Sequence, residues 1–170
     1  MGDEQDLPSV VYDCVVFFQG LIKETGPSVD CLDLFEHGRV ELFISDELLY
    51  EIGDVLTRPE LQRRYPLLTR ERAETLLEGL EKKATLVESV PAVFSYERDP
   101  KDEMYVNLAI AASAAYLVSR DNDLLDLMKD NMAGKEFRQR FPSLTILDPV
   151  TSYVRWKRGA NANESRGVQF

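Results

Sequence analysis

Four carboxylates lie far apart in the chain, and each borders a segment with a regular apolar pattern. They are Asp13, Glu51, Asp102 and Asp121. A hard cation such as Mg²⁺ prefers oxygen ligands and needs only one or two direct carboxylates beside a phosphate group. If the fold brings these side chains together, they can hold a divalent cation that assists hydrolysis of a phosphodiester bond.

Asp13 is the most informative of the four acids because it interrupts the apolar run of residues 10–17. That run predicts a strand covered on both faces, as in a parallel sheet between helices. A carboxylate in such a strand needs a cation, hydrogen-bond donors or a water-filled cleft, since burying it alone is costly. The alternative is that Asp13 ends the strand and caps the next helix, because aspartate is a common N-cap.

Glu51 lies in a predicted helix over residues 46–56 that Ser45 can cap. At about 100° per residue, the apolar side chains of this helix form one stripe, and Glu51 lies at its edge. Glu51 is therefore the acid of this helix that is best placed to face a cleft. The alternative is a partly buried glutamate that forms a salt bridge or reaches toward solvent.

The remaining acids lie where helices begin. Asp99 precedes Pro100 and predicts an N-cap, while Asp102 falls in the first helical turn, where the macrodipole favours negative charge. Asp121 and Asp123 follow an apolar strand and precede a helix, so turn formation and capping explain them as well. Ligands of open α/β sheets bind beyond the carboxyl ends of the strands, which keeps these acids candidates for a metal site.

Predicted strands and helices alternate along the chain. This order predicts an α/β protein, a three-layer α/β/α sandwich with a central, largely parallel sheet. The predicted strands span residues 10–17, 40–44, 85–87, 116–119 and 144–147. The predicted helices are a short one after the first strand, then 27–37, 46–56, 59–64, 70–83, 100–115, 124–129, 135–141 and a last one from about residue 149. We expect a single domain over residues 9–154, with disordered termini at 1–8 and 157–170.

Composition excludes several classes of chemistry. A chain of 170 residues that is 44% hydrophobic and 29% charged fits one globular domain. No window approaches the roughly 20 apolar residues of a membrane span, and the first residues lack a secretory pattern, so we expect a cytoplasmic protein without a membrane partner. Cys14 and Cys31 give neither a disulfide framework nor zinc-ligand spacing. His37 is the only histidine, which excludes histidine-rich metal sites.

The charge balance opposes a nucleic-acid substrate. Lys plus Arg number 20 against 30 Asp plus Glu, and the net charge of −10 repels a polyanion. Bound metal ions would offset part of this charge locally. Basic residues cluster at 58–72 and at 155–166, where they either track a phosphate backbone or form a solvated face.

The order and context of four segments resemble the PIN-domain family of metal-dependent ribonucleases. These segments are the strand that carries Asp13, the helical segment 45–52 with Glu51, the segment 99–102 that opens an alanine-rich helix, and the segment 116–125. The resemblance covers residues 10 to about 153. It is strongest to the bacterial branch whose members are the toxin components of toxin–antitoxin pairs, the VapC-like ribonucleases.

This resemblance implies a metal-dependent endoribonuclease, the toxin component of such a pair. It implies catalytic roles for Asp13, Glu51, Asp102 and Asp121, and metal binding by Asp13, Asp102, Asp121 and Asp123. It also implies Mg²⁺ or Mn²⁺ as the cofactor, RNA as the substrate, an antitoxin protein as a partner, and a homodimer. In this interpretation the acids hold metal and water rather than attack the substrate.

The chain departs from the family pattern beside two of these acids. Many members follow the first aspartate with Thr and Asn, where this chain has Cys14 and Val15, and Gln19 about one helical turn later is the candidate substitute. Glycine is usual before the fourth acid, where this chain has Arg120, which can crowd the site or bind a phosphate bidentately. The residues predicted to support the site are Gln19, Asp99, Ser119, which keeps a hydroxyl common in that segment, and Arg120.

Two other functions compete with this one. The departures at Val15 and Arg120 also fit a PIN-like module that binds nucleic acid or protein and has weak or no catalytic activity. A phosphatase of the haloacid dehalogenase type would need a second aspartate two residues after Asp13, where Val15 stands. The sequence therefore favours the ribonuclease, with the binding module as the alternative.

Overall fold

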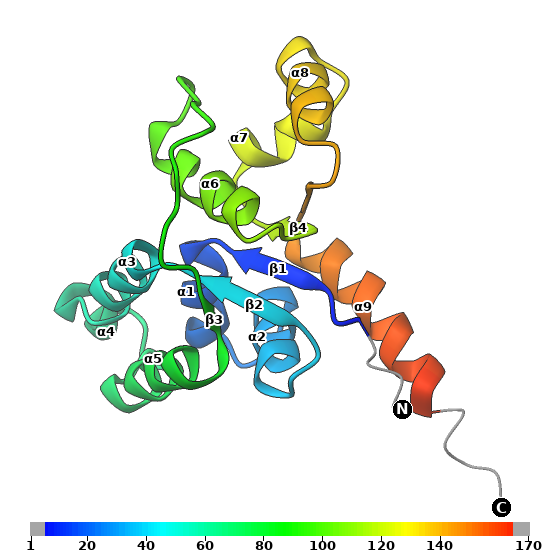
Figure 1. Ribbon diagram of the computed structural model, residues 1–170. Helices are drawn as coiled ribbons and strands as arrows, with labels where there is room; N and C mark the ends of the chain where they lie inside the picture. Colours follow the sequence, from blue (N-terminus) through cyan, green and yellow to red (C-terminus); the bar gives the residue numbers. More distant parts are fainter. Residues whose placement is uncertain (1–5, 165–170) are drawn as a thin grey trace, which may run out of the picture.

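The computed structural model describes the main chain of residues 6–164 and the side chains of residues 6–157. Within these residues, five parallel strands form one sheet in the order β3-β2-β1-β4-β5 (Figure 1). The strands are β1 (Ser9–Tyr12), β2 (Glu41–Ile44), β3 (Thr85–Leu86), β4 (Tyr116–Val118) and β5 (Thr145–Leu147). The predicted parallel sheet is confirmed.

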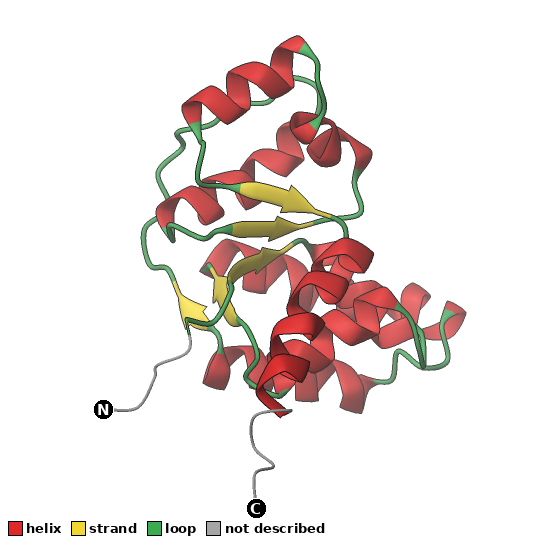
Figure 2. Cartoon of the chain, turned by 90° about the vertical axis from the view of Figure 1, so that its right-hand side faces the viewer, coloured by secondary structure: helices red, strands yellow, loops and turns green. Residues whose placement is uncertain are grey.

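Helices cover both sides of this sheet (Figure 2). Helix α6 (Glu103–Ala111) packs on β1, β2 and β4, whereas α1 (Cys14–Ile22) contacts α2 (Pro27–Glu36) and α3 (Asp46–Leu56). The other helices are α4 (Pro59–Arg64), α5 (Arg70–Lys83), α7 (Asn122–Leu125), α8 (Met132–Arg140) and α9 (Pro149–Glu164), with 3₁₀ turns η1 (Pro100–Asp102) and η2 (Asp126–Met128). The layered α/β class predicted from the sequence is therefore confirmed.

The strand order places a switch point between β1 and β4. From β1 the chain adds β2 and β3 on one side of the sheet, and it then returns to add β4 and β5 on the other side. The last residues of the two central strands, Tyr12 and Val118, are partners in the parallel register, and the Asp13 amide donates to the Val118 carbonyl over 3.1 Å. Since crevices of open α/β sheets form at such points, this edge is the first place to seek a site.

The predicted first strand is wrong beyond Tyr12. Asp13 turns the chain into α1 and is its N-cap, because its carboxylate accepts the amide of Val16 over 3.1 Å. The cap outweighs the strand preference of the valine and phenylalanine residues that follow, since that preference depends on context. These residues still reach the core from a helix, as Val16 and Phe17 are buried.

Two helix ends also differ from the prediction. The alanine-rich helix α6 ends at Ala111 rather than near residue 115, because Ser113 adopts a left-handed φ of 52° that closes the last turn. At the other end of the chain, α9 continues to Glu164 and so takes up residues that the sequence predicts to be disordered. The rest of that predicted tail, residues 165–170, and residues 1–5 lie outside the described part of the chain.

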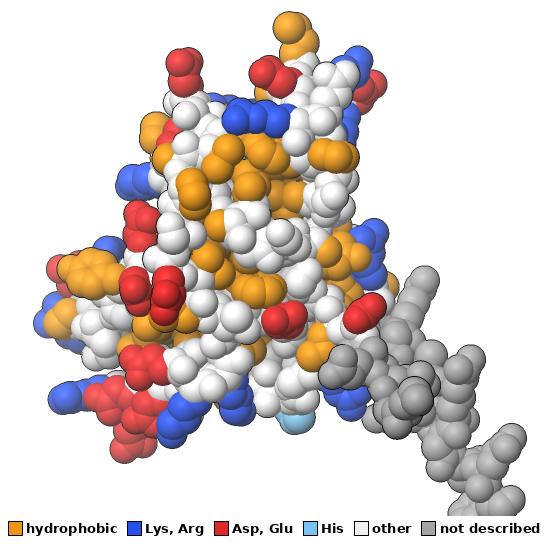
Figure 3. Space-filling view, viewed as in Figure 1, with side chains coloured by type: hydrophobic (Ala, Val, Ile, Leu, Met, Phe, Trp, Pro, Cys, Tyr) orange, Lys and Arg blue, Asp and Glu red, His pale blue; other side chains and the backbone are white. Residues whose placement is uncertain are grey.

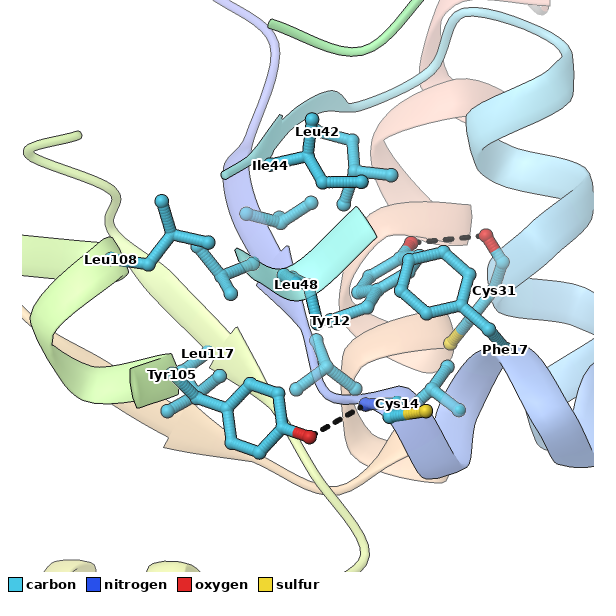
Figure 4. Packing of buried hydrophobic residues seen from close by; sticks show 14 of the residues in the cluster. Tyr12, Cys14, Phe17, Cys31, Leu42, Ile44, Leu48, Tyr105, Leu108 and Leu117 are labelled. Atoms are coloured by element: carbon cyan, nitrogen blue, oxygen red, sulfur yellow. Dashed lines mark hydrogen bonds between the residues drawn. The ribbon is translucent and has the colours of Figure 1, made fainter. Parts of the chain in front are cut away.

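The core behind the switch point is apolar and contains both cysteines. Tyr12 packs against Phe17 with ring centroids 5.8 Å apart and donates its hydroxyl to the Cys31 carbonyl over 3.0 Å (Figure 4). Cys14 and Cys31 are buried free thiols, as expected for small core residues. No helix in the described residues is long and apolar enough to cross a bilayer.

Candidate metal centre

Four aspartates meet at the sheet edge where β1 and β4 end. One carboxylate oxygen from each of Asp99, Asp102, Asp121 and Asp123 lies within 4.8 Å of the others. Two of these side chains come from the segment around η1, and two come from the start of α7, Asp121 as its N-cap and Asp123 in its first turn. We call these four side chains the acidic cluster. Two segments that are remote in sequence thus supply one group of oxygen ligands.

Capping geometry explains how two members of the acidic cluster are held. Asp99 accepts the amide of Lys101 over 3.1 Å and caps η1, as the sequence predicts. Asp121 accepts the amide of Asp123 over 2.8 Å and caps α7. A carboxylate has two oxygens and about four acceptor sites, so a cap leaves room for a cation. Capping and metal binding are therefore compatible at these residues.

Asp102 is the member that capping does not explain. Its side chain is only 5% exposed, and its Oδ2 atom finds no hydrogen-bond partner among the side chains and main chain described. Burial is the main cause that raises the pKa of Asp102 from 3.8 to about 7, followed by the nearby charges of Asp121 and Asp99. A buried carboxylate that has one oxygen without a donor and belongs to a cluster of other carboxylates is stabilised by a bound cation. The donor set is all oxygen, which suits a hard divalent ion.

Asp13 lies beside the acidic cluster and is connected to it through Ser119. The Ser119 hydroxyl donates to Asp13 Oδ2, and the same Ser119 oxygen accepts the amide of Asp121 over 2.9 Å. Burial raises the pKa of Asp13 to about 6, although the hydrogen bonds from Ser119 and Val16 lower it. The buried Asp13 carboxylate is thus satisfied by donors and fixes the position of the Asp121 backbone.

Glu51 stands apart from the four clustered oxygens and is held by a tyrosine. The Tyr105 hydroxyl donates to Glu51 Oε2 over 3.0 Å. The same hydroxyl accepts the Cys14 amide over 3.4 Å (Figure 4). Tyr105 is buried, and burial followed by the Glu51 charge raises its pKa above the ordinary range, so it stays a donor. Glu51 also lines a hollow of about 560 Å³ between α3 and α6.

Two arginines lie close to the acids. Arg98 pairs with Asp123 over 2.5 Å and with Asp126 over 2.9 Å, which offsets part of the negative charge. Arg120 is exposed, and its guanidinium donates to Gln19 over 2.6 Å. Arg120, which departs from the family pattern, is thus hydrogen-bonded to Gln19, the candidate substitute for the missing polar group.

Three arginines of the predicted basic cluster at 58–72 are engaged by the chain's own groups. Arg58 pairs with Asp54 over 2.7 Å, and Arg70 pairs with Glu74 over 2.8 Å. Arg72 donates to two main-chain carbonyls. These contacts favour the solvated-face interpretation over a phosphate track. In the second basic cluster, the side chains beyond residue 157 lie outside the described part.

Sequence reasoning missed Tyr105 and Arg98. Tyr105 falls three residues after Asp102 in an alanine-rich helical pattern, where an aromatic residue is expected to be core, and no local pattern points it toward Glu51. Arg98 lies in a long connection without a regular pattern, and its pairing with Asp123 spans 25 positions of the chain. Only the fold brings these partners together.

The family model described as PIN domain matches residues 9–123 of the chain. The protein belongs to the PIN-domain family. Asp13, Glu51 and all four members of the acidic cluster fall inside the matched residues. No curated protein sequence matches the chain.

A similar fold is also found in the comparison with solved structures. The crystal structure of PAE2754 from Pyrobaculum aerophilum is similar, with a TM-score of 0.52 and 17% sequence identity. The alignment covers 91% of this chain and 94% of that one. At this identity the likeness concerns the fold, so the function of the PIN domain described here depends on its own residues.

Proposed function

We propose that this protein is a metal-dependent endoribonuclease that hydrolyses RNA phosphodiester bonds at the acidic cluster. One observation carries the proposal: Asp102 buries an unpartnered carboxylate oxygen among three other aspartates. Membership of the PIN family supports it. A buried carboxylate in this setting is costly by itself and becomes favourable when a divalent cation is bound.

The residues divide into those that hold the cation and those that position them. Asp102 and Asp121 are the first candidates for direct ligands, with Asp99 and Asp123 completing the oxygen set. A bound Mg²⁺ or Mn²⁺ lowers the pKa of a water ligand and neutralises charge on the attacked phosphate. Ser119 connects Asp13 to the Asp121 backbone, so these two positioning contacts keep the ligand segment in place.

Glu51 is the candidate for the group that orients the attacking water and accepts its proton. Tyr105 holds Glu51 Oε2, and the Cys14 amide in turn fixes the Tyr105 hydroxyl. A carboxylate held by one donor keeps further acceptor sites for a water molecule. Tyr105 therefore acts through Glu51 as a positioning residue.

Arg120 supplies positive charge where a phosphate would bind. Its side chain is exposed and reaches Gln19 over 2.6 Å, which holds the guanidinium near the sheet edge. A guanidinium presents paired N–H donors to phosphate oxygens. In a chain with a net charge of −10, such a local contact and the metal ion offset the repulsion of RNA.

Finer parts of the proposal come from the family resemblance. We infer that the substrate is RNA, that the protein is the toxin component of a toxin–antitoxin pair in the cytoplasm, and that it forms a homodimer. We also infer that residues 9–154 form a single domain. An antitoxin protein would then be the natural inhibitor.

Cleavage of a mixed single-stranded RNA pool tests the proposal. Purified protein is assayed with Mg²⁺, with Mn²⁺ and with chelator, alongside Asp121→Asn, Asp13→Asn and the control Asp130→Asn, whose side chain is 84% exposed. We expect metal-dependent cutting that the control retains and that Asp121→Asn abolishes. Absence of cutting with every metal, in a folded protein that still binds RNA, would favour the catalytically inactive binding module instead.

A further inference from the structure

The hollow beside Glu51 is built from two kinds of surface. Val90, Ala92 and Met104 give it apolar walls, whereas Glu47 and Tyr50 line it from α3. Its volume of about 560 Å³ lies within the range of small-ligand sites. It therefore has room for a nucleoside next to the proposed catalytic glutamate.

Tyr50 is the unusual residue of this hollow. Its side chain is 79% exposed although it directly precedes Glu51 on α3. Other exposed or half-buried rings, such as that of Tyr153 beside Lys157, have a cation over them. By contrast, the Tyr50 ring has no aromatic or cation partner in the described part of the chain. The Tyr50 ring thus presents an open π face. Nucleobases stack on such faces, and the stacking itself does not depend on the charge of the phosphate.

Glu47 is the acceptor that accompanies this ring. It lies three residues before Tyr50, so the two side chains are neighbours on one face of α3. Two other acids of the hollow are already engaged, since Asp54 pairs with Arg58 and Glu103 accepts the Tyr96 amide over 2.7 Å. Glu47 is exposed and forms no ion pair within the described residues.

We propose that this hollow binds one base of the RNA, a guanine, which stacks on Tyr50 and donates its N1–H and amino group to the Glu47 carboxylate. The proposal rests on the ribonuclease function and adds a base preference to it. Guanine offers two adjacent donors to a carboxylate, which accepts bidentately. Uracil offers one N–H between two carbonyl oxygens, which face a carboxylate unfavourably.

Charge favours a base over a phosphate at this position. Acidic and hydrophobic side chains lie side by side over α3 on the face drawn in Figure 3. The lining holds four acids, Glu47, Glu51, Asp54 and Glu103, against one cation, Lys101. The excess of negative charge disfavours a phosphate there, whereas a neutral base with N–H donors is attracted. Because Tyr50 and Glu51 both line the hollow, a base stacked on Tyr50 holds its nucleotide near the water-orienting glutamate.

The test uses dinucleoside monophosphates, which carry a single phosphate, and chelator, which prevents cleavage. The ¹⁵N-labelled full chain is titrated with guanylyl-uridine (GpU), its inosine analogue (IpU) and uridylyl-uridine (UpU). The titrations are followed by NMR, and the shifts of α3 amides locate the ligand. We expect GpU to bind at least about fivefold more tightly than UpU, and Tyr50→Ala to weaken GpU binding about tenfold. Tyr50→Phe, which keeps the ring, should restore most of the affinity, and Glu47→Gln should remove the preference for GpU over IpU and UpU.

Met132→Ala is the matched control, because Met132 is 89% exposed and lies outside the hollow. Equal binding of GpU by the wild type and Tyr50→Ala, or equal affinity for GpU and UpU, would overturn the base site. Binding of acetyl-arginine amide in place of GpU would assign the hollow to a protein partner and also overturn it. Cleavage by the wild type with metal is scored separately, so failure of the base site and failure of the ribonuclease proposal are distinguishable.

Discussion

Replacing Asp102 by asparagine should stabilise the metal-free protein at alkaline pH. The substitution keeps the shape of the side chain and removes a charge that is buried among carboxylates. In the folded protein the pKa of Asp102 is raised from 3.8 to about 7. Between these values the folded protein holds a proton that the unfolded chain has lost, so the free energy of unfolding falls as pH rises from about 4 to about 7 and is level above that.

The size of the effect follows from the raised pKa. At roughly 1.4 kcal/mol per pKa unit, ionising Asp102 in the folded protein costs up to about 4 kcal/mol above pH 7. Solvent around the half-buried neighbours screens this cost, and the helix terminus favours the charge, so we expect Asp102→Asn to gain about 2 kcal/mol. Below about pH 4 the wild type is also neutral at this position, and the difference should vanish.

Urea unfolding in chelator at pH 4 and pH 8 measures this difference. Saturating Mn²⁺ at pH 8 should then reverse it, because a metal bound at 100 times its Kd stabilises the wild type by about 2.7 kcal/mol. Asp130→Asn provides the control for removing one exposed acid. If Asp102→Asn were no more stable than the wild type at pH 8 in chelator, the argument from burial and repulsion would be refuted.

Two further substitutions test the positioning contacts. Ser119→Ala leaves Asp13 Oδ2 and the Asp121 amide without their shared partner, so we expect a loss of about 1–3 kcal/mol in the free energy of unfolding and weaker Mn²⁺ binding. Denaturant titration and a metal titration check this, and retention of both quantities would show that the serine is dispensable. Tyr105→Phe frees Glu51, so we expect kcat for RNA cleavage to fall about tenfold with little change in KM, since only the orientation of the water is lost. A change in KM alone would instead indicate that Tyr105 acts on substrate binding.

Local patterns predicted most of the fold because the helix boundaries follow local rules. Ser45 caps α3 at the predicted residue, and the helix covers the predicted range Asp46–Leu56. The first strand was predicted too long because Val and Phe suit both strands and buried helices, and the cap at Asp13 decides between them. The structure shows the cap weighed for Asp13, and it also shows the buried carboxylate accepting the Ser119 hydroxyl, one of the donors weighed as the other explanation.

The acidic cluster was predictable only in part. Asp102, Asp121 and Asp123 lie together as expected. Asp99 joins them as a fourth source of oxygen, although its sequence context indicated only an N-cap and a residue that supports the site. Glu51 lies outside the clustered oxygens. Contacts such as those of Tyr105 with Glu51, 54 positions apart, depend on how helices pack on the sheet, and no local pattern carries that information.

Electron paramagnetic resonance of bound Mn²⁺ is the direct test of the proposed metal centre. We expect the wild type to bind Mn²⁺ and Asp102→Asn and Asp121→Asn each to weaken binding at least about tenfold. Asp130→Asn should bind like the wild type. If the wild type bound no Mn²⁺, or if both cluster variants bound it as tightly as the wild type, the metal centre proposed here would be contradicted.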